Sequence, residues 1–328
     1  ITGSHIRGIN SSGMVAIKDK EVSRSDVRRV LDTATAINIS NDQRLLLVES
    51  QEFVIDGQDV KDPIGMSGIR LEAKVHIVTG AQSAAENIIK CVHRCGLEVE
   101  HLMLNPMASS LAVLTNDERE LGVVLVDIGA GTTDVAVFTG GAIRHTAVIP
   151  IAGDLITSDI AMALRTPTKD AEEIKIDSGF AKQLLTDPDS QVEVPGLGDR
   201  GPRLLSKQAL AGVIEPRIEE IFTLVQQAIR ETGYEEVLSS GIVLTGGASV
   251  MPGMIELGED IFLKPVRRGI PKYSGNLSDM VAQARASTVM GLLEEASLAR
   301  LRGMKVGHNN GSIKNTLSRA KDWLIGNF

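Results

Sequence analysis

Hydrophobic and polar residues alternate strictly along residues 69–79 of this chain. One face of this run carries Ile, Leu, Ala and Val, and the other carries Arg, Glu, Lys and His. A period of two with one apolar face predicts a half-buried β-strand. Shorter apolar runs predict three more strands, at 14–17, 45–49 and 52–55. Because Ser23 and Asp26 also form a capping box before a segment of helical periodicity, we expect residues 1–80 to form a small α+β unit.

Beyond residue 80, apolar positions recur mainly with the period of a helix. Helices are predicted at 83–95, 106–114, 153–164, 170–176, 206–231 (interrupted at Pro216) and 285–299. Strands are predicted at 99–104 and 242–245, and a hairpin at 122–150 with Gly140-Gly141 at its turn. Pro, Gly and Asp crowd residues 187–202, which favours a loop or a small sheet edge. Strands that alternate with helices are typical of an α/β fold.

The composition narrows the class of protein. A chain of 328 residues with 43% hydrophobic and 23% charged residues is typical of about two globular domains. The net charge of −8 argues against a nucleic-acid partner, and no apolar run approaches the ~18 residues of a transmembrane helix. Residues 301–328 contain five Lys/Arg and one Asp, so they carry a net +4 and leave −12 on the remainder. A basic tail on an acidic body indicates an interaction segment.

The two cysteines, Cys91 and Cys95, lie four residues apart on one face of a predicted helix. We interpret them as small buried hydrophobic side chains in a reducing compartment. A zinc site would need further ligands at suitable spacing, and His93 alone is near.

Residues 123–134 carry the strongest chemical signal. A buried strand runs into Asp127, and a Gly-Ala-Gly turn and two threonines follow. Glycines leave backbone N–H groups open to an approaching anion. A carboxylate at the end of the strand can hold hydrated Mg²⁺ beside phosphates. The stretch therefore predicts a phosphate-binding β-hairpin, although Asp-x-Gly also forms ordinary hairpin turns.

Two other segments could complete a nucleotide site. Gly246 and Gly247 follow a second buried strand, at the end where α/β sheets place ligands. An ordinary strand-to-helix turn is the alternative. Glu172 and Lys175 share a helix face and could hydrogen-bond a ribose and flank a base, and a solvated helix pair is the alternative.

These three segments, in this order and spacing, resemble the actin/Hsp70/sugar-kinase ATPase superfamily. The resemblance is closest to the FtsA family of bacterial cell-division proteins and covers essentially the whole chain. The stretches that carry it are 117–122, 135–145, 214–217 (Ile-Glu-Pro-Arg) and 241–248. It implies that ATP binds with Mg²⁺, which Asp127 would hold through water. The nucleotide contacts it implies are Gly129, Gly131, Thr132 and Thr133 at the phosphates, Glu172 and Lys175 at the ribose and base, and Gly246 and Gly247 at the adenosine.

The resemblance also implies an architecture. We expect an α/β actin-like ATPase fold, with two lobes of mixed sheets flanked by helices, an inserted α+β subdomain and a C-terminal amphipathic helix. The expected parts are subdomain 1C, an SHS2-like insertion, at 1–80; the remainder of 1A at 81–121; 2A at 122–164 and 233–284; 2B at 165–232; the final 1A helix at 285–302; a linker at 303–311; and a membrane-targeting helix at 312–328.

The sequence departs from the superfamily pattern in two places. Superfamily members open with an Asp-x-Gly-[Ser/Thr] hairpin, whereas this chain opens on Ile1 within a strand-like run, so we expect it to be N-terminally truncated. Asn105 stands where related ATPases have a glutamate that positions the attacking water. Because an amide is not a base, we expect weak or slow ATP hydrolysis and assign no catalytic residue.

Residues 312–328 have the pattern of an amphipathic helix. One stripe carries apolar residues, and Lys and Arg lie on its flanks or the opposite side. The residues predicted to enter the membrane are Ile313, Leu317, Trp323, Leu324 and Phe328. Basic residues and a tryptophan on such a helix indicate binding in a membrane interface. A terminal helix docked on the protein body is the alternative.

The function implied by the resemblance is that of a scaffold. We expect an actin-like ATP-binding protein that self-associates and tethers the tubulin-like GTPase FtsZ to anionic lipid. Its expected place is the cytoplasmic face of the cell inner membrane at the division septum, where subdomain 1C would recruit later divisome proteins. The alternatives are a small-molecule kinase, a chaperone ATPase, or another actin-fold ATPase similar to PilM or MreB.

Overall fold

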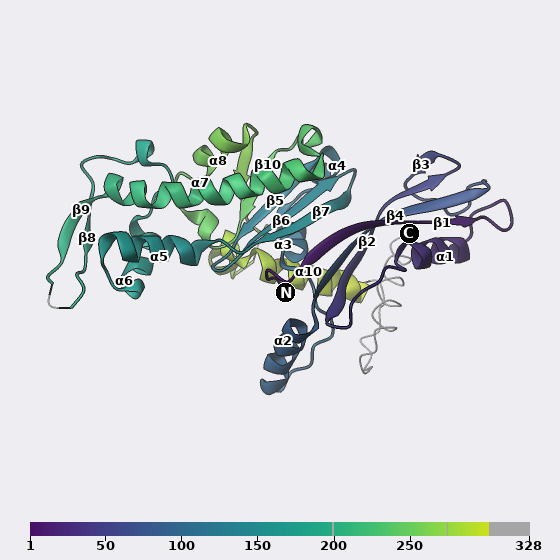
Figure 1. Cartoon of the computed structure of the whole chain (residues 1–328), viewed down its shortest axis with the longest axis horizontal. Coiled ribbons are helices and arrows are strands. Elements are labelled where there is room, and N and C mark those ends of the chain that lie inside the picture. The colour runs from purple at the N-terminus through teal and green to yellow at the C-terminus, as the bar shows by residue number, and fades with distance from the viewer. Residues whose placement is uncertain (199, 274, 302–328) are drawn as a thin grey trace.

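The computed structural model describes residues 1–198, 200–273 and 275–301. These residues form two β-sheets, a two-stranded ribbon and the helices around them (Figure 1). The first sheet lies at one end of the molecule, the second in its middle, and the ribbon at the opposite end. The molecule is therefore elongated, with the predicted phosphate-binding hairpin near its centre.

The first sheet is antiparallel and has the strand order β1-β4-β2-β3. Its strands are β1 (Arg7–Ala16), β2 (Gln43–Ile55), β3 (Gln58–Val60) and β4 (Arg70–Ala81). Helix α1 (Arg24–Ala34) packs against this sheet, and apolar side chains from both form a core of their own. The helix begins at the predicted capping box, in which the Ser23 hydroxyl accepts from the backbone N–H of Asp26. These elements form an α+β unit within the first 81 residues.

Strand β4 shows the expected alternation in its first half. Leu71, Ala73 and Val75 are buried in the core under α1, whereas Ile69 precedes the strand and is 76% exposed. From His76 onward, successive residues on both faces are buried. The face opposite α1 is covered there by the second sheet, so the strand is not half-buried along its whole length.

The second sheet is mixed and has the order β11-β10-β5-β6-β7. Its strands are β5 (Val123–Ile128), β6 (Thr133–Thr139), β7 (Ala142–Ile149), β10 (Ile242–Thr245) and β11 (Val266–Arg268). Strand β5 runs parallel to β10 and antiparallel to β6. The predicted hairpin at 122–150 is therefore a three-stranded meander, with one turn at 129–132 and another at Gly140-Gly141. Every residue of β5 is buried, as expected for a central strand.

Helices cover both faces of the second sheet. Val124 and Val126 of β5 face α7 (Lys207–Thr232) and α8 (Met254–Phe262), and Val123 and Leu125 face α3 (Asn105–Val113). Helix α10 (Ser287–Leu301) packs against α3. The other helices are α2 (Gln82–Arg94), α4 (Asn116–Leu121), α5 (Gly153–Leu164), α6 (Thr168–Ser178) and α9 (Ser278–Val281). The ribbon consists of β8 (Gln191–Val194) and β9 (Arg203–Ser206).

Some local predictions are wrong because tertiary packing decides them. Residues 99–104 and 1–3 form no strand, and the two strands predicted within residues 45–55 are one strand, β2, with two irregularities. Helix α7 continues through Pro216, where the buried side chains of Ile214 and Ile218 fix it to the core.

The interpretation of the cysteines is also wrong. Cys91 and Cys95 are both exposed. Helix α2 projects from the body of the molecule (Figure 1), and Ala85 is its one buried residue. The helical period correctly identified a common face, but nothing in the described part of the chain covers that face.

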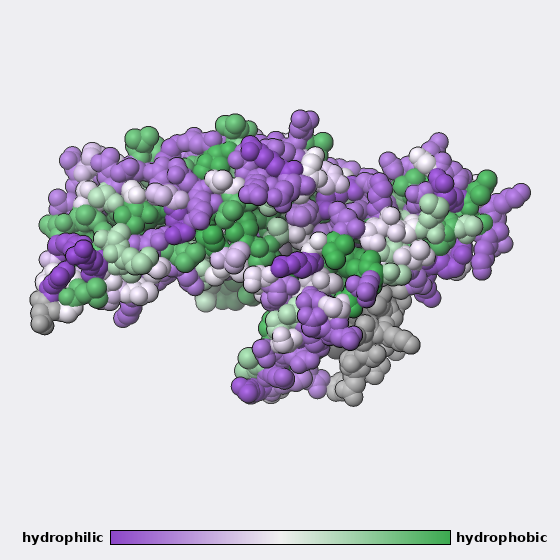
Figure 2. All heavy atoms as spheres, viewed as in Figure 1, coloured by the Kyte–Doolittle hydropathy of each residue, from purple (hydrophilic) through white to green (hydrophobic). Residues whose placement is uncertain are grey.

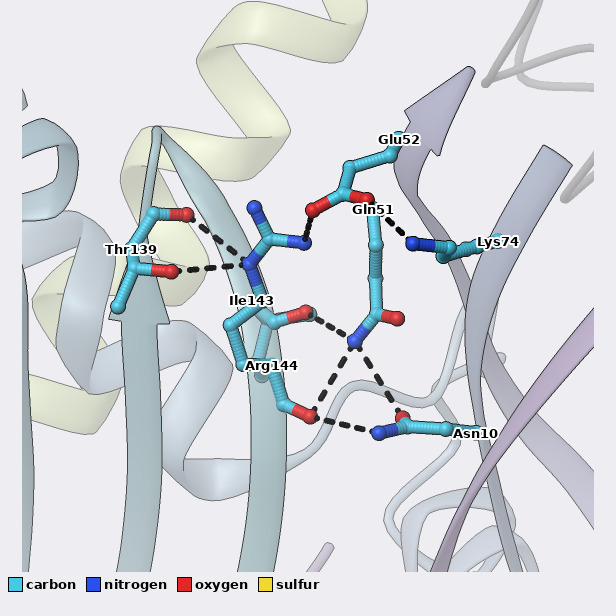
Figure 3. Close-up of polar contacts among 7 residues, drawn as sticks. All are labelled: Asn10, Gln51, Glu52, Lys74, Thr139, Ile143 and Arg144. Carbon is cyan, nitrogen blue, oxygen red and sulfur yellow. Dashed lines mark hydrogen bonds and ion pairs between the residues drawn. The ribbon is translucent and has the colours of Figure 1, made fainter. Parts of the chain in front are cut away.

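Polar side chains join the first sheet to β7 (Figure 3). Arg144 of β7 is nearly buried, and its Nη1 lies 2.6 Å from Oε1 of Glu52, whose Oε2 lies 2.9 Å from Nζ of Lys74. The Arg144 Nε donates to the backbone oxygen and Oγ1 of Thr139. These cations hold the pKa of Glu52 below its usual range: the hydrogen bond from Lys74 is the largest cause, and Arg144 adds to it against the effect of burial. Glu52 is thus an ionised bridge between the two sheets.

Amide and imidazole groups extend this junction. Gln51 Nε2 donates to the backbone oxygens of Ile143 and Arg144, and Asn10 Nδ2 donates to that of Arg144 (Figure 3). His76 lies 2.6 Å from Asn10 Oδ1 and 2.9 Å from Thr146 Oγ1. Burial lowers the pKa of His76 to about 4, so the imidazole is neutral at physiological pH. The junction is a satisfied polar network with a single buried cation, Arg144, at its centre.

Hydrophilic residues cover most of the face shown in Figure 2, and hydrophobic residues form smaller patches between them. Within residues 1–301, as far as they are described, no helix combines the length and apolar character that crossing a membrane requires.

Candidate functional site

The predicted phosphate turn joins β5 to β6. Asp127 pairs with Asp134 and Ile128 with Thr133 across the two strands, and the amide of Gly129 donates to the carbonyl of Thr132 at 2.9 Å. A Cβ on Gly131 would meet no atom within 4 Å, so the tip of the turn is open. The turn therefore has the accessible backbone that an anion site requires.

The two threonines of the turn point to different surroundings. Thr133 is fully buried, and its hydroxyl donates to the carbonyl of Ile151 at 2.7 Å. Thr132 is only partly buried, and its hydroxyl donates to Asp134 Oδ2 at 3.3 Å. Thr132 is thus the threonine whose hydroxyl remains at the turn surface, whereas that of Thr133 is used inside the fold.

Asp127 lies at the base of the turn, where β5 and β10 end side by side. Its Oδ2 accepts from Ser109 of α3 at 2.5 Å and from Thr288 of α10 at 3.4 Å. Its Oδ1 faces Gly246, where an added Cβ would lie 2.4 Å away. Burial raises the pKa of Asp127, and the two hydroxyls lower it. The carboxylate is held in place and lies against the predicted adenosine-binding turn.

The Gly246-Gly247 turn needs glycine at its first position. Gly246 has φ +87°, and a Cβ there would also approach the carbonyl oxygen of Ile128 to 2.5 Å. A side chain at Gly247 would meet its nearest atom, on Arg285, at 3.9 Å, so this position borders open space. Thr245, just before the turn, pairs with Asp127 across the parallel strands. The second glycine segment therefore lies directly beside the phosphate hairpin.

Helix α6 contributes the Glu172–Lys175 pair. Lys175 Nζ lies 2.6 Å from Glu172 and donates to Thr157 Oγ1 at 2.8 Å and to the carbonyl of Gly153 at 3.1 Å. The Lys175 side chain is only 10% exposed, which rules out a freely solvated lysine. The amide of Gly153 donates to the carbonyl of Gly129 at 3.1 Å. Gly153 thus links the α6 pair to the phosphate turn.

A pocket of about 410 Å³ adjoins this pair. It lies between α5 and α6, and its lining residues are Asp154, Thr157, Thr168, Lys169, Glu172 and Glu173. The lining includes Glu172 but not Lys175, whose amine is turned toward Gly153. Of the predicted pair, Glu172 is therefore the member with access to this pocket.

Asn105 begins α3, on the other side of the phosphate turn. Its side-chain Oδ1 accepts from the nitrogen of Ile1 at 3.1 Å, and its backbone N–H donates to the Ile1 carbonyl at 3.1 Å. The next residue, Thr2, donates through its hydroxyl to Asp134 Oδ1. Asn105 is thus linked to the turn through the short segment Ile1-Thr2.

Four residues that contact the candidate site were not predicted from the sequence: Ser109, Gly153, Thr157 and Thr288. Each touches a predicted site residue, but from another element of the fold. Of these four, only Gly153 has a sequence feature that could have identified it, because it is a glycine at the start of a helix that follows a strand. Serine and threonine within helices give no such signal, because they occur there without any ligand.

The donor set of this site fits Mg²⁺ bound together with phosphates. No group of three or more His, Cys, Asp or Glu side chains able to hold a metal alone occurs among the described residues. Mg²⁺ commonly keeps several waters and uses one or two carboxylates plus phosphate oxygens. Asp127 and Asp134 at an open glycine turn provide this arrangement.

The predicted membrane residues Ile313, Leu317, Trp323, Leu324 and Phe328 lie outside the described residues.

Asp134 should make stability depend on pH. Burial is the largest cause that raises its pKa, from 3.8 to about 6, with a smaller contribution from Asp127. A carboxyl group whose pKa is raised on folding favours the folded state while protonated. The free energy of unfolding therefore falls as pH rises from 3.8 to about 6, by up to about 3 kcal/mol.

We expect Asp134→Asn to remove this loss, because the amide does not ionise. The free energy of unfolding should rise by about 2 kcal/mol near pH 7.5 and change little near pH 4. Urea unfolding of both proteins across this pH range measures the difference. A gain of equal size at both ends of the range would contradict the assignment to ionisation of Asp134.

Comparison with known proteins agrees with this geometry. The sequence model of the family described as "Cell division protein FtsA" matches residues 124–291, and that of "SHS2 domain inserted in FTSA" matches residues 3–79. The cell division protein FtsA of Pseudomonas aeruginosa is 54% identical over 335 residues, which cover 100% of this chain and 80% of that protein. The FtsA of Neisseria meningitidis serogroup B is 48% identical over 336 residues, covering 100% and 81%.

Among solved structures, MreB5 of Spiroplasma citri bound to ADP is similar, with a TM-score of 0.54, 20% identity and 67% of each chain covered. At this identity the likeness concerns the fold alone, and it confirms the predicted actin-like ATPase fold.

Proposed function

This chain belongs to the FtsA family of cell division proteins, and from that premise we propose that it is an ATP-dependent membrane tether for a cytoskeletal polymer. In this proposal it binds ATP with Mg²⁺, self-associates as an actin-like polymer, and holds FtsZ at the membrane. Its place is the cytoplasmic face of the inner membrane at the division septum. The first sheet and α1 form the surface offered to later divisome proteins.

The observation that carries the nucleotide part is the meeting of three distant segments at one site. Asp127 touches Gly246, the carbonyl of Gly129 accepts from Gly153, and the carbonyl of Gly153 accepts from Lys175. An ordinary hairpin, an ordinary strand-to-helix turn and a solvated helix pair would have no reason to converge. Their convergence beside an open glycine turn supports a nucleotide site.

The described residues fit distinct roles toward ATP and Mg²⁺. When bound, the metal supplies positive charge that neutralises the phosphates. Asp127 would hold it through water, the open turn at Gly131 and Thr132 would receive the phosphates, and Glu172 would reach the ribose. Asn105 has no carboxylate with which to accept a proton from water. The site is therefore suited to sensing ATP more than to rapid hydrolysis.

The membrane part of the proposal rests on the sequence of residues 312–328. A single amphipathic helix binds a membrane marginally and reversibly. An array of such helices on a polymer binds far more tightly, because each later attachment is intramolecular. Self-association governed by ATP would thus control membrane attachment and the tethering of FtsZ together.

Co-sedimentation with vesicles of phosphatidylethanolamine and phosphatidylglycerol tests the proposal. FtsZ with GTP should pellet with the vesicles when this chain and Mg-ATP are present. The double variant Trp323→Glu/Leu324→Glu should lower the pelleted FtsZ about fivefold or more, because two charges enter the apolar stripe. The matched variant Asn315→Glu/Ser318→Glu adds the same charge to the predicted polar side and should retain most of the binding. FtsZ that pellets equally with both double variants would overturn the tether.

A further inference from the structure

Hydroxyl groups of α3 and α10 contact the ends of both strands that carry the nucleotide segments. Asp127 is the last but one residue of β5, Thr245 ends β10, and the two residues are partners in the parallel ladder. Two consecutive residues of α10 reach this pair: Ser287 Oγ lies 2.6 Å from Thr245 Oγ1, and Thr288 Oγ1 lies 3.4 Å from Asp127 Oδ2. The first turn of α10 is thus bonded to both nucleotide segments.

Ser109 of α3 completes this group, which we call the hydroxyl clamp (Ser109, Thr245, Ser287 and Thr288). Its Oγ donates to Asp127 Oδ2 at 2.5 Å and lies 2.9 Å from Thr288 Oγ1. Ser109 and Thr245 are fully buried, and Ser287 is 1% exposed. A hydrogen bond between a buried hydroxyl and a carboxylate is among the stronger kinds, so this contact fixes the carboxylate firmly.

The clamp divides the two oxygens of Asp127 between different surroundings. The hydrogen bonds that Asp127 accepts from side chains of the described residues all fall on Oδ2. Oδ1 lies against Gly246, so closely that a Cβ there would be 2.4 Å from it. The two hydroxyls thus hold the carboxylate through Oδ2, and Oδ1 is the oxygen on which no side-chain hydrogen bond from the described residues falls.

We propose that Ser109 and Thr288 are positioning residues for metal-dependent nucleotide binding, which they serve by holding Asp127 through its Oδ2. This inference rests on the proposed function and adds to it the residues that make Asp127 a preformed Mg²⁺ site. Helices α3 and α10 pack against each other, so the position of the carboxylate is tied to the position of that helix pair. Hydrated Mg²⁺ would then be recognised when α3 and α10 are in their packed arrangement.

Binding of a fluorescent ATP analogue by the full chain, measured by anisotropy, tests this inference. The Mg²⁺ concentration for half-maximal binding should rise about tenfold in Ser109→Ala, the order expected on losing a hydrogen bond to a charged group. In Thr288→Val the rise should be about threefold, because this contact is longer, and Thr288→Ser should restore the Mg²⁺ dependence of the unaltered chain. Binding in EDTA should change less than about twofold in every variant, because the clamp acts through the metal ligand.

Ser110→Ala is the matched control. Ser110 neighbours Ser109 on α3 and is equally buried, but its hydroxyl donates to the carbonyl of Met107 and accepts from Arg119 Nη2. It should leave the Mg²⁺ dependence unchanged. Circular dichroism establishes that each variant is folded, and the Thr288 pair gives a result even where Ser109→Ala unfolds.

The outcomes separate this inference from the proposed function. If the unaltered chain binds the analogue with Mg²⁺ but Ser109→Ala and Thr288→Val keep its Mg²⁺ dependence, the positioning role is wrong and the nucleotide site stands. Equal losses with Mg²⁺ and in EDTA would assign the clamp a purely structural role and also overturn the inference. An unaltered chain that binds no analogue in either buffer overturns the proposed function, and the inference with it.

Discussion

Replacing Gly291 with valine is expected to remove about 4 kcal/mol or more from the free energy of unfolding. Gly291 is one of two buried residues of α10, and a Cβ placed there would lie 1.7 Å from the backbone oxygen of Ala108 and 2.4 Å from its carbonyl carbon. Backbone atoms cannot rotate away as a flexible side chain can. The helices α3 and α10 would have to separate, and the helix contact that supports the hydroxyl clamp would be lost.

Urea unfolding followed by circular dichroism measures this effect. Gly201→Val is the control, because a Cβ at Gly201 meets no atom within 4 Å, and its effect should stay within about 0.5 kcal/mol. The intrinsic preference of valine over glycine in a helix works against the expected loss, and it amounts to less than about 1 kcal/mol. Cooperative unfolding of Gly291→Val with a free energy within about 1 kcal/mol of the unaltered chain would show that the helices do not approach so closely.

The sequence predicts local features of this fold well, because they depend on neighbouring residues. The capping box at Ser23 and Asp26, the turn after Asp127 and the glycine turn at Gly246 are all found where the sequence predicts them. Each arises from backbone geometry that only certain residues favour. The close approach of Gly291 to Ala108 was not predicted, because it depends on how two helices far apart in the sequence pack.

Features that depend on what covers a face were predicted less well. The helical period places Cys91 and Cys95 on one side of α2 without showing whether another element packs there. The alternation of residues 69–79 predicts one solvated face, yet His76 is buried because β7 crosses that face. Both errors have the same cause: periodicity defines the faces of an element, and tertiary structure decides which of them are buried.

In the candidate site, too, local motifs were predicted and contacts made by tertiary packing were not. Asp127 and the phosphate turn were predicted because they lie in a motif with its own spacing, and Lys175 because the family resemblance implies it. Ser109 and Thr288 reach Asp127 from positions 18 and 161 residues away along the chain. Hydroxyl side chains in helices are common, so only the packing of α3 and α10 identifies these two.

Charge reversal at the junction between the two sheets is the second large effect we expect. Glu52→Arg would place a third cation beside Arg144 and Lys74, and Arg144→Glu would leave Glu52 facing another carboxylate. The Arg144 side chain is 10% exposed and that of Glu52 28%, so solvent screens the pair less than it screens a fully exposed pair. Each single variant should lose about 3 kcal/mol of the free energy of unfolding, the low end of the range for a broken buried ion pair, because Arg144 is buried and Glu52 only partly so.

The double variant Glu52→Arg/Arg144→Glu restores opposite charges across the junction and should recover about 2 kcal/mol of the summed loss in a double-mutant cycle. Lys61→Glu is the matched control, since the Lys61 side chain is 80% exposed in its pair with Glu120, and it should cost less than about 1 kcal/mol. A coupling energy below about 0.5 kcal/mol would mean that Glu52 and Arg144 stabilise the chain independently. The first sheet would then be fixed to β7 by the amide contacts of Gln51 and Asn10, which charge reversal leaves in place.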